Sequence, residues 1–314
     1  MKKTARVLSL ILVLALFAIM AIGSGSSSSS NDVKAPSSVS TGGQTTETTT
    51  SDTTESNTTS NSTAASDVTI EEAVVFDQGG IRITAKSFDA KGVFGPEIKL
   101  LIENDSDNSV TVQSRNTSVN GYMVETLFSA DVASGKKAND SLTIMSSYLD
   151  IAGITTVAVI EFSFHIFDSE TWETIYDSDP ITIETSAAEG YTYSFDDSGN
   201  QVYNEDGVEI VVKGLSDSSS WLGPEIVVYI SNTSDRGVTV QARDVSINGF
   251  MVEPFFSCDV AQGKHAIDTV TFMSTELEEN EIETIESVEL SFHVFDLDTW
   301  DTIVDTSPVT INFD

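Results

Sequence analysis

The sequence predicts an all-β protein that contains two tandem copies of one small β-sandwich domain. Three observations support this prediction. A set of motifs returns at a fixed spacing, each copy holds seven or eight short apolar runs separated by turn residues, and almost no segment has helical periodicity. The fold class is therefore all-β, and the repeat determines how the chain is divided.

The internal repeat is the strongest of these signals. Gly95-Pro96-Glu97-Ile98 returns as Gly223-Pro224-Glu225-Ile226, and Phe164-His165-Ile166-Phe167-Asp168 returns as Phe292-His293-Val294-Phe295-Asp296. From Gly95 onward the offset of 128 residues holds without a gap, and about half of the positions are identical. A match of this length does not arise by chance, so the chain contains two copies of one unit.

Each copy is expected to consist of short strands. The clearest strand-like runs of the first copy, which all have counterparts in the second, cover residues 81–86, 97–103, 110–113 and 156–167. The one helical hint per copy is a capping-box pattern, at 147–150 and 275–278. This number of strands in about 110 residues is typical of an immunoglobulin-like β-sandwich, and a closed barrel is the alternative.

Turn residues separate these runs at matching places in the two copies. Asn120-Gly121 and Asn248-Gly249 are strong signals for two-residue hairpins. Asp168 and Asp296 are expected to form a turn that leads into a strand carrying a tryptophan. Both features reinforce the prediction of an antiparallel all-β fold.

Composition and charge exclude several classes of partner. The chain has 49 acidic and 15 basic residues, and its formal net charge of -34 repels phosphate backbones and anionic lipid. We therefore expect no nucleic-acid binding and no membrane contact by the folded domains. The single cysteine, Cys258, rules out an intrachain disulfide and replaces Ala130 of the first copy. It is expected to be a small buried side chain.

The first 23 residues have the form of a signal segment. Lys2 and Arg6 accompany an apolar run over 7–22, and small residues follow it. The run of about 16 residues is short for a membrane span, which favours a cleaved peptide over an N-terminal membrane anchor. Ser24 stands where a lipoprotein would have its lipid-accepting cysteine, so lipidation is not expected there. Either outcome predicts an extracellular or cell-surface location.

Residues 24–66 are rich in serine and threonine, which make up 25 of these 43 positions. So few apolar side chains cannot offset the entropy of ordering, which predicts a disordered stalk. The expected division is a signal peptide or anchor at 1–23, the stalk at 24–66, the first sandwich copy at 67–186, a linker at 187–201 and the second copy at 202–314.

The repeated motifs also resemble those of a known group of proteins. The Gly-Pro-Glu strand at 95–97, the Asn-Gly hairpin, the run at 164–168 and Thr171-Trp172 are similar to uncharacterised tandem immunoglobulin-like modules of secreted or lipoprotein-type Gram-positive (clostridial) surface proteins, with an immunoprotective-antigen-like sandwich. The resemblance covers 67–314. It implies a fold and a surface location, and it transfers no catalytic residue because its motifs are turn and core residues.

No pattern of catalytic residues is visible. The nucleophile elbow, the His-Glu-x-x-His zinc motif, Cys-x-x-Cys and the phosphate-binding glycine patterns are all missing. Three histidines in the whole chain offer few general acids or bases near neutral pH. We therefore predict that the protein is not an enzyme.

The candidate ligand-binding residues are those that carry chemistry at equivalent positions of both copies. His165 and His293 are each either a strand histidine with a hydrogen bond at the surface or a pH switch or metal ligand, which would need partners that the local sequence does not supply. Arg115 and Arg243 either pair with a neighbouring carboxylate or hold an anionic group of a ligand.

Trp172 and Trp300 complete this set. Each either packs in the core or at its rim, or forms a stacking platform for a sugar. Their place just after a turn, with an isoleucine three residues later, favours a core or rim position.

Calcium is the cofactor that the charge suggests. Asp105, Asp107 and Asn108 cluster in one loop, and hard cations prefer such oxygen ligands. The second copy has Thr-Ser-Asp-Arg at 233–236 instead, and no complete calcium-loop pattern is present. We therefore expect no bound metal or cofactor, with calcium as the alternative.

Two functions are consistent with these observations. The first is a surface interaction module of adhesion type, which presents loops or an edge strand to an unknown protein or glycan. The alternative is a structural spacer or cell-envelope component without a specific ligand. Two copies suit both, because two weak sites increase avidity and two rigid units increase reach.

Overall fold

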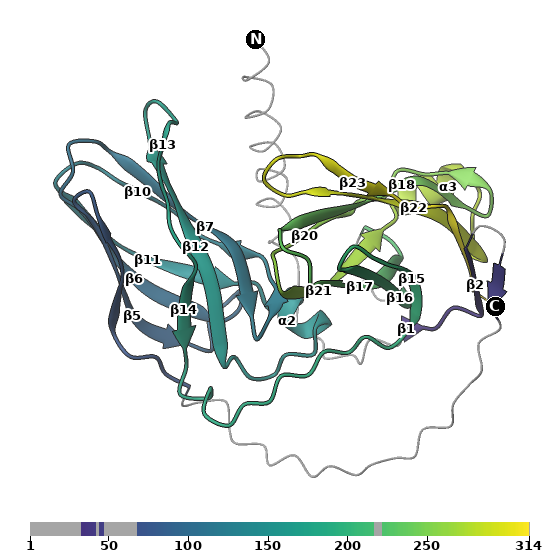
Figure 1. Ribbon diagram of the computed structural model, residues 1–314, viewed down its shortest axis with the longest axis horizontal. Coiled ribbons are helices and arrows are strands. Elements are labelled where there is room, and N and C mark those ends of the chain that lie inside the picture. The colour runs from purple at the N-terminus through teal and green to yellow at the C-terminus, as the bar shows by residue number, and fades with distance from the viewer. Residues whose placement is uncertain (1–32, 42–43, 47–67, 217–221, 314) are drawn as a thin grey trace. The chain divides into compact units, whose positions relative to one another are not determined.

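The computed structural model describes residues 33–41, 44–46, 68–216 and 222–313, and it is all-β with several sheets (Figure 1). The described strands form three hydrogen-bonded sheets of eleven, eight and five strands. The all-β prediction is confirmed, and the sheets are consistent with a sandwich. The signal segment at 1–23 lies outside the described residues. None of the described helices is both long enough and apolar enough to cross a membrane.

The first copy contributes strands to two sheets. The five-stranded sheet has the order β4 (Ala73–Gln78), β5 (Ile81–Asp89), β6 (Glu97–Asn104), β11 (Lys136–Ile144) and β9 (Thr126–Leu127). The other layer contains β7 (Val110–Val119), β8 (Tyr122–Met123), β10 (Ser129–Val132), β12 (Val159–Asp168), β13 (Thr174–Asp177) and β14 (Ile181–Glu184).

The second copy repeats this arrangement. One layer contains β15 (Asn200–Glu205), β16 (Val208–Ser216), β17 (Glu225–Asn232) and β21 (Lys264–Thr271). The other contains β18 (Val238–Ile247), β19 (Phe250–Met251), β20 (Ser257–Val260), β22 (Ser287–Asp296), β23 (Thr302–Asp305) and β24 (Val309–Asn312). The pairing of β12 on β7 recurs 128 residues later as β22 on β18, including the register shift in mid-strand.

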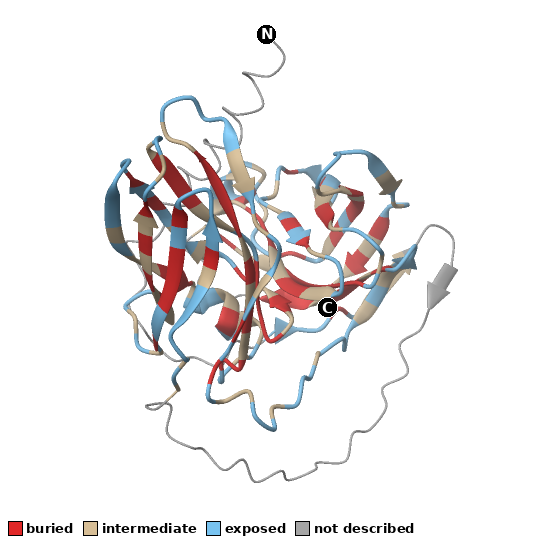
Figure 2. Ribbon diagram, turned by 60° about the vertical axis from the view of Figure 1, so that its left-hand side comes forward, coloured by how far each residue is buried: buried red, intermediate tan, exposed pale blue. Residues whose placement is uncertain are grey.

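Alternation along the strands produces the core. In β6 the side chains of Ile98, Leu100 and Ile102 are fully buried, and in Figure 2 buried and exposed positions alternate along many strands. These side chains pack against Val112 and Phe164 of the facing layer, in one cluster of buried apolar residues. The sheets therefore pack face to face, as in a sandwich.

The same alternation places Cys258 in the core of the second copy. It is a free, buried cysteine, and its counterpart Ala130 is buried in the first copy. The prediction of a small buried side chain at this position is therefore confirmed.

The Asn-Gly hairpins form as predicted. Asn120 and Gly121 both have positive φ, 52° and 85°, and they connect β7 to β8. Asn248 and Gly249 repeat this geometry with φ of 50° and 87°. Positive φ at both central positions gives the turn the twist of the flanking strands.

One short helix follows the long strand of each copy, α2 (Ser146–Ile151) and α3 (Ser274–Glu279). The helices lie where the sequence predicted them, but the capping-box interpretation is wrong. Each helix begins after a methionine, Met145 or Met273, and neither has a side-chain cap. The Ser/Thr residues of the pattern lie inside the first turn and cannot act as caps.

The prediction of a stalk without regular structure is wrong for part of its length. Three short strands lie there: β1 (Val33–Lys34), β2 (Ser38–Thr41) and β3 (Gln44–Thr46). β1 pairs with β16 and β2 pairs with β24, so both add to sheets of the second copy. The remainder of the predicted stalk, apart from 35–37, lies outside the described residues. Composition alone suggested disorder here. The strands that pair with this segment, β16 and β24, lie far along the chain, so nothing in the local sequence indicated them.

A smaller apolar cluster joins the two copies. Tyr122 of β8 packs with Val227, Tyr229 and Ile267 of the second copy. Phe195, from the linker, stacks on His265 with ring centroids 3.7 Å apart. Lys264 also forms an ion pair with Glu161 of β12. These contacts cover the outward side of β17 and β21.

Candidate functional site

Each copy exposes one face of the layer that contains β7, β10, β12 and β13, or their counterparts. In β7 and β12 the even-numbered side chains Val112, Phe164 and Ile166 are buried in the core. The odd-numbered positions therefore point outward, and the strand register places them in rows across the sheet.

One row holds four polar residues, Asp177, His165, Gln113 and Ser129, which are direct neighbours on β13, β12, β7 and β10. The Nδ1 atom of His165 lies 2.5 Å from Oδ1 of Asp177. The Gln113 amide donates to Ser129 Oγ at 3.2 Å. The row therefore presents a connected series of donors and acceptors at the surface.

The second copy reproduces this row with the same residue types. His293 Nδ1 lies 2.6 Å from Asp305 Oδ1, and the Gln241 amide donates to Ser257 Oγ at 3.2 Å. Asp305 is highly exposed, and the histidine beside it is mostly buried. In both copies the carboxylate therefore faces solvent, and its contact with the mostly buried imidazole holds it in this orientation.

A second row lies beside the first and holds Asp131, Thr111 and Phe167. Thr111 Oγ1 donates to Asp131 Oδ1 at 2.6 Å, and Thr239 donates to Asp259 at 2.7 Å in the second copy.

The arginines lie at the next outward position of β7 and β18. Arg115 Nη1 is 3.8 Å from Asp177 Oδ1, whereas Arg243 donates to Gln241 Oε1 at 2.6 Å. Burial lowers the pKa of the Arg115 guanidinium, and Asp177 opposes this shift. The prediction that an arginine pairs with a carboxylate thus describes Arg115, while Arg243 bonds the neighbouring amide.

The tryptophans extend the face on the other side. Trp172 stacks on Phe167 with centroids 5.5 Å apart and an interplanar angle of 18°, and Trp300 stacks on Phe295 at 5.5 Å and 20°. Trp172 is 60% exposed and Trp300 is 68% exposed. Of the two positions expected for these tryptophans, core or rim, the core is therefore wrong. One ring face packs on phenylalanine, and most of the side chain is in solvent.

The backbone of these tryptophans also differs from the expected strand. Trp172 has φ of 61° and Trp300 has φ of 65°, so both lie in the left-handed region, in the turn before β13 and β23. A bulky residue in this region carries a local strain. In each copy the tryptophan N–H donates to the carbonyl of the turn aspartate, Asp168 or Asp296, at 2.9 and 3.0 Å.

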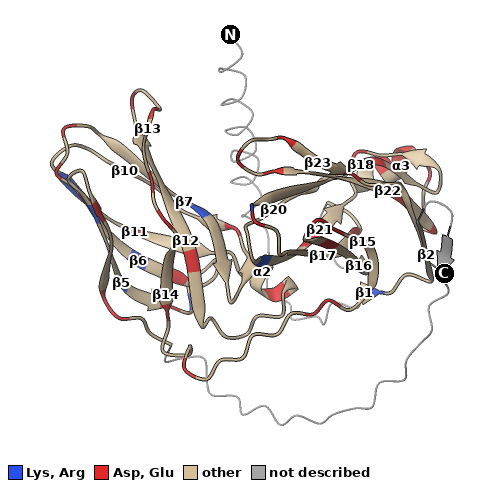
Figure 3. Cartoon of the chain, in the orientation of Figure 1, with Lys and Arg blue, Asp and Glu red and all other residues tan. Residues whose placement is uncertain are grey.

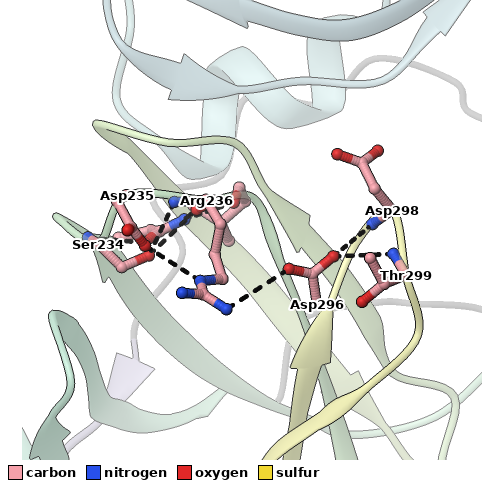
Figure 4. Close-up of polar contacts among 8 residues, drawn as sticks. Ser234, Asp235, Arg236, Asp296, Asp298 and Thr299 are labelled. Carbon is pink, nitrogen blue, oxygen red and sulfur yellow. Dashed lines mark hydrogen bonds and ion pairs between the residues drawn. The ribbon is translucent and has the colours of Figure 1, made fainter.

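The turn aspartates fix this geometry, as the sequence predicted. Asp296 Oδ1 accepts the backbone N–H groups of Asp298 and Thr299 at 3.0 and 2.8 Å (Figure 4). The N–H of Thr299 lowers the pKa of the Asp296 carboxyl. Asp168 accepts two N–H groups in the same way in the first copy. The tryptophans are therefore held in place by side chain-to-backbone bonds of the turn.

We call this set of residues the Trp–His face. In the first copy it consists of Thr111, Gln113, Arg115, Ser129, Asp131, Ser163, His165, Phe167, Trp172 and Asp177, and in the second copy of Thr239, Gln241, Arg243, Ser257, Asp259, Ser291, His293, Phe295, Trp300 and Asp305. All ten positions are identical between the copies.

On the outward side of the opposite layer, most positions differ between the two copies. Of eight outward positions on β6 and β11, six differ between the copies: Lys99/Val227, Leu101/Tyr229, Glu103/Ser231, Lys137/His265, Asn139/Ile267 and Ser141/Thr269. In the second copy this side carries the apolar residues that contact Tyr122 and Phe195. Of these two outward sides, the one that carries the Trp–His face has the greater identity between the copies.

The residues singled out from the sequence lie together on the Trp–His face of their own copy. They are Arg115, His165 and Trp172 in the first copy and Arg243, His293 and Trp300 in the second. Sequence reasoning missed Asp177 and Asp305, which lie twelve positions after their histidines, and it missed the phenylalanine beneath each tryptophan. The signal that could have identified them is identity between the copies at outward strand positions.

A groove of about 490 Å³ lies beside the Trp300 turn, and the first copy has a depression at the equivalent place. Arg236 lines it and contacts Asp235 at 3.1 Å and Asp296 at 3.9 Å (Figure 4). The depression of the first copy has Asn108 in place of Arg236, and it shares Ser106, Asp107 and Ile175 as counterparts of Ser234, Asp235 and Ile303. Acidic positions predominate over basic ones along the described chain, as Figure 3 shows.

The loop considered for calcium is held by its own hydrogen bonds. Asn104 Oδ1 accepts the N–H of Ser106 at 3.0 Å, and its amide donates to the carbonyl of Asn108 at 2.8 Å. Across the residues that the structure describes, no three histidine, cysteine or acidic side chains are grouped as a metal site would require.

Comparisons with known proteins leave the family of this chain open. No family model matches the sequence, and no curated protein matches it. One similar solved structure is the crystal structure of the YadV chaperone, with 11% identity over 69% of this chain and 92% of that chain. Its TM-score of 0.22 is too low to support an argument about fold or function.

Proposed function

We propose that this chain is a non-catalytic, exported surface protein whose two copies are immunoglobulin-like domains, each of which binds a glycan through its Trp–His face. The observation that carries the proposal is the identity of all ten face residues in two copies that differ at about half of their positions. The form of the N-terminal segment supports export.

Packing explains identity in the core and at the buried members of the face, such as Thr111 and Phe167, but not at its exposed members. Side chains such as Val112 and Phe164 are buried, and a change of volume there costs stability. Exposed polar positions are usually tolerant, with effects within about 0.5 kcal/mol. A shared ligand accounts for the retention of exposed Trp172 and Asp177 together with their counterparts.

The chemistry of the face suits a sugar. The exposed ring of Trp172 offers a flat apolar surface against which a pyranose can stack. Asp177, Gln113 and Ser129 offer acceptors and donors in a neighbouring row for ring hydroxyls. Arg115 adds a fork of N–H donors that can bind hydroxyls or a carboxylate.

The two sites can be counted in solution. We would titrate the full chain with a panel of soluble oligosaccharides by calorimetry and expect two equivalent sites per chain for a matching glycan. Trp172→Gly or Trp300→Gly should each leave one site, and the double variant should leave none. Loss of an aromatic anchor of at least 2 kcal/mol corresponds to a weakening of about 30-fold or more.

Exposed apolar residues away from the face provide the control. Val93 is 90% exposed and Phe250 is 48% exposed, so Val93→Ala with Phe250→Ala removes surface apolar groups without touching the face. This control should retain both sites. Binding that survives the double tryptophan variant would contradict the proposal.

A spacer is the second candidate, because the two copies are joined by direct contacts. Phe195 stacks on His265, and Lys264 pairs with Glu161, which would limit movement between the units. If no oligosaccharide or peptide of the panel binds, and deletion of one copy is the only change that affects the intact cell, the spacer role is favoured.

A further inference from the structure

The second copy is completed by a segment that precedes the first copy in sequence. Four residue pairs join β2 to β24, from Ser38 opposite Asn312 to Thr41 opposite Val309. Ser37 N–H and Oγ both donate to the Asn312 carbonyl, at 2.8 and 3.0 Å, and the Asn312 amide donates to Ser38 Oγ at 2.9 Å. The partners lie 275 positions apart in the chain.

The same segment covers a second edge. Val33 lies opposite Ser216 and Lys34 lies opposite Leu215, so β1 continues the edge of β16 beyond β15. Pro36, between β1 and β2, is buried, and Val39 packs against the core of the second copy. The segment Val33–Thr41, which we call the donor segment, therefore belongs to the second copy in structure although not in sequence.

In the first copy, the residues just before its first strand contact the end of that same copy. Thr69, just before its first strand, accepts the N–H of Ser186 at 2.7 Å, and its own N–H donates to Ser186 Oγ at 3.0 Å. In this part of the chain the strands recur after 127 residues, β4 as β15 and β5 as β16, so the counterpart of Thr69 is Asp196, in the linker. The linker makes other contacts instead, because Asp196 N–H donates to the Tyr122 hydroxyl and Phe195 stacks on His265.

The linker is thus committed to the junction between the copies, which leaves the edges of β16 and β24 open to another strand. Unpaired edges accept extended segments from any source that matches in register. Most contacts of the donor segment are to backbone atoms or small polar side chains, so they do not depend on which molecule supplies it.

The connection to the first copy does not force pairing within one molecule. Residues 47–67 separate β3 from the start of the first copy and can span up to about 70 Å at 3.3–3.6 Å per residue. A tether of this length gives an effective concentration of about millimolar for the internal strand. A second molecule competes when its own concentration approaches that value.

We propose that the donor segment exchanges between molecules, so that the open edges of β16 and β24 in one chain accept Val33–Thr41 of a second copy of the same chain. The exchange is independent of glycan binding. It would link chains head to tail at high local density, because the donor and acceptor of each chain lie at different places in its sequence.

A disulfide between two variants reports the exchange directly. Both variants carry Cys258→Ala, which restores the residue of the first copy and removes the native thiol. One then carries Ser38→Cys and the other Asn312→Cys, two positions that lie directly opposite each other on β2 and β24. After mild oxidation, a mixed disulfide-linked dimer forms only if the segment of one molecule sits on β24 of the other.

The matched control replaces Asn312→Cys with Glu184→Cys, the equivalent exposed position of β14 in the first copy. We expect the Ser38→Cys and Asn312→Cys mixture to give more mixed dimer than this control, with a yield that rises as total concentration approaches millimolar. A yield equal to the control at every concentration would overturn the proposal. A chain carrying both cysteines should close internally at low concentration, and failure to close would overturn the pairing itself.

Discussion

His165 and Asp177 lie directly opposite each other on β12 and β13, with Nδ1 of the histidine 2.5 Å from Oδ1 of the aspartate, and His293 and Asp305 repeat the contact at 2.6 Å. The histidine side chain is 11% exposed in the first pair, while that of the aspartate is 62% exposed. The pair therefore orients a carboxylate toward solvent, and it does so at the same place on two separate surfaces.

This pair predicts a separation between stability and binding. Asp177→Asn keeps the shape of the side chain but removes its charge. The free energy of unfolding, measured in urea, should therefore change by less than about 1 kcal/mol, as for an exposed pair. Glycan binding at the first site should weaken about tenfold or more, as calorimetry would show. Asp179→Asn, an exposed neighbour after β13, serves as the control. A large loss of stability without loss of binding would assign the pair a structural role.

The left-handed tryptophans give a second prediction. At φ of 61°, alanine keeps the strain of Trp172, whereas glycine relieves about 1–2 kcal/mol of it. Both substitutions remove the stacking on Phe167. Trp172→Gly should therefore be at least as stable as Trp172→Ala in urea unfolding, and Trp300 should give the same order. The reverse order at both sites would show that the turn does not impose this backbone in solution.

Asp268 on β21 predicts a pH dependence of stability. Burial raises the pKa of its carboxyl to about 7, and the N–H of Thr269 opposes the shift. Because the folded state holds this proton more tightly than the unfolded state, its contribution is full below about pH 4 and is lost as pH rises to 7. Asp268→Asn should therefore be more stable than wild type at pH 8, on the order of 4 kcal/mol, with little difference at pH 4.

The equivalent aspartate of the first copy provides the control for this pH effect. Asp140 occupies the equivalent position on β11, so Asp140→Asn tests whether any loss of charge on this strand gives the same result. Chemical unfolding at several pH values from 4 to 8 measures both variants. Parallel pH profiles for wild type and Asp268→Asn would refute the assignment.

A further prediction concerns the hairpin asparagines. Asn120 Oδ1 accepts the N–H groups of Ala158 and Val159, and its amide donates to the Thr156 carbonyl and the Tyr191 hydroxyl. Asn120→Gly keeps the positive φ but leaves buried groups unpaired, which costs about 1–3 kcal/mol each. Urea unfolding should show a loss of at least about 2 kcal/mol.

The second copy supplies the comparison for this hairpin. Asn248 makes the three equivalent bonds but has no counterpart of the bond to Tyr191, and it is more exposed than Asn120. Asn248→Gly should therefore cost less than Asn120→Gly. Equal losses would mean that the backbone turn, rather than the side-chain bonds, determines stability here.

Local signals in the sequence were sufficient for much of the fold. Asn120-Gly121 specified its turn because both residues tolerate positive φ, and the Ile/Leu-rich run at 97–103 predicted the strand β6. The turn aspartate Asp168 was also identified correctly, since its bonds reach only two and three residues ahead.

Features that depend on distant partners were not predicted. Trp172 was placed on a strand because the stacking on Phe167 and the bond to the Asp168 carbonyl, which hold it in the turn, are not visible in local composition. The partner of His165 comes from the next strand, and its identity depends on register. β2 was predicted as disordered, since only the edge of β24, far along the chain, gives it regular structure.

The pairing of β2 with β24 also determines how the chain would respond to a mechanical load. Ser38 and Asn312 lie at the same end of this antiparallel pair, so tension applied before Val33 and after Phe313 would peel the strands apart one residue pair at a time. Peeling requires little force because the bonds break in sequence. Residues 42–67, which connect β2 to the first copy, have a fully extended length of about 90 Å. The donor segment would thus detach first when the chain is pulled suddenly, while both sandwich cores stay folded.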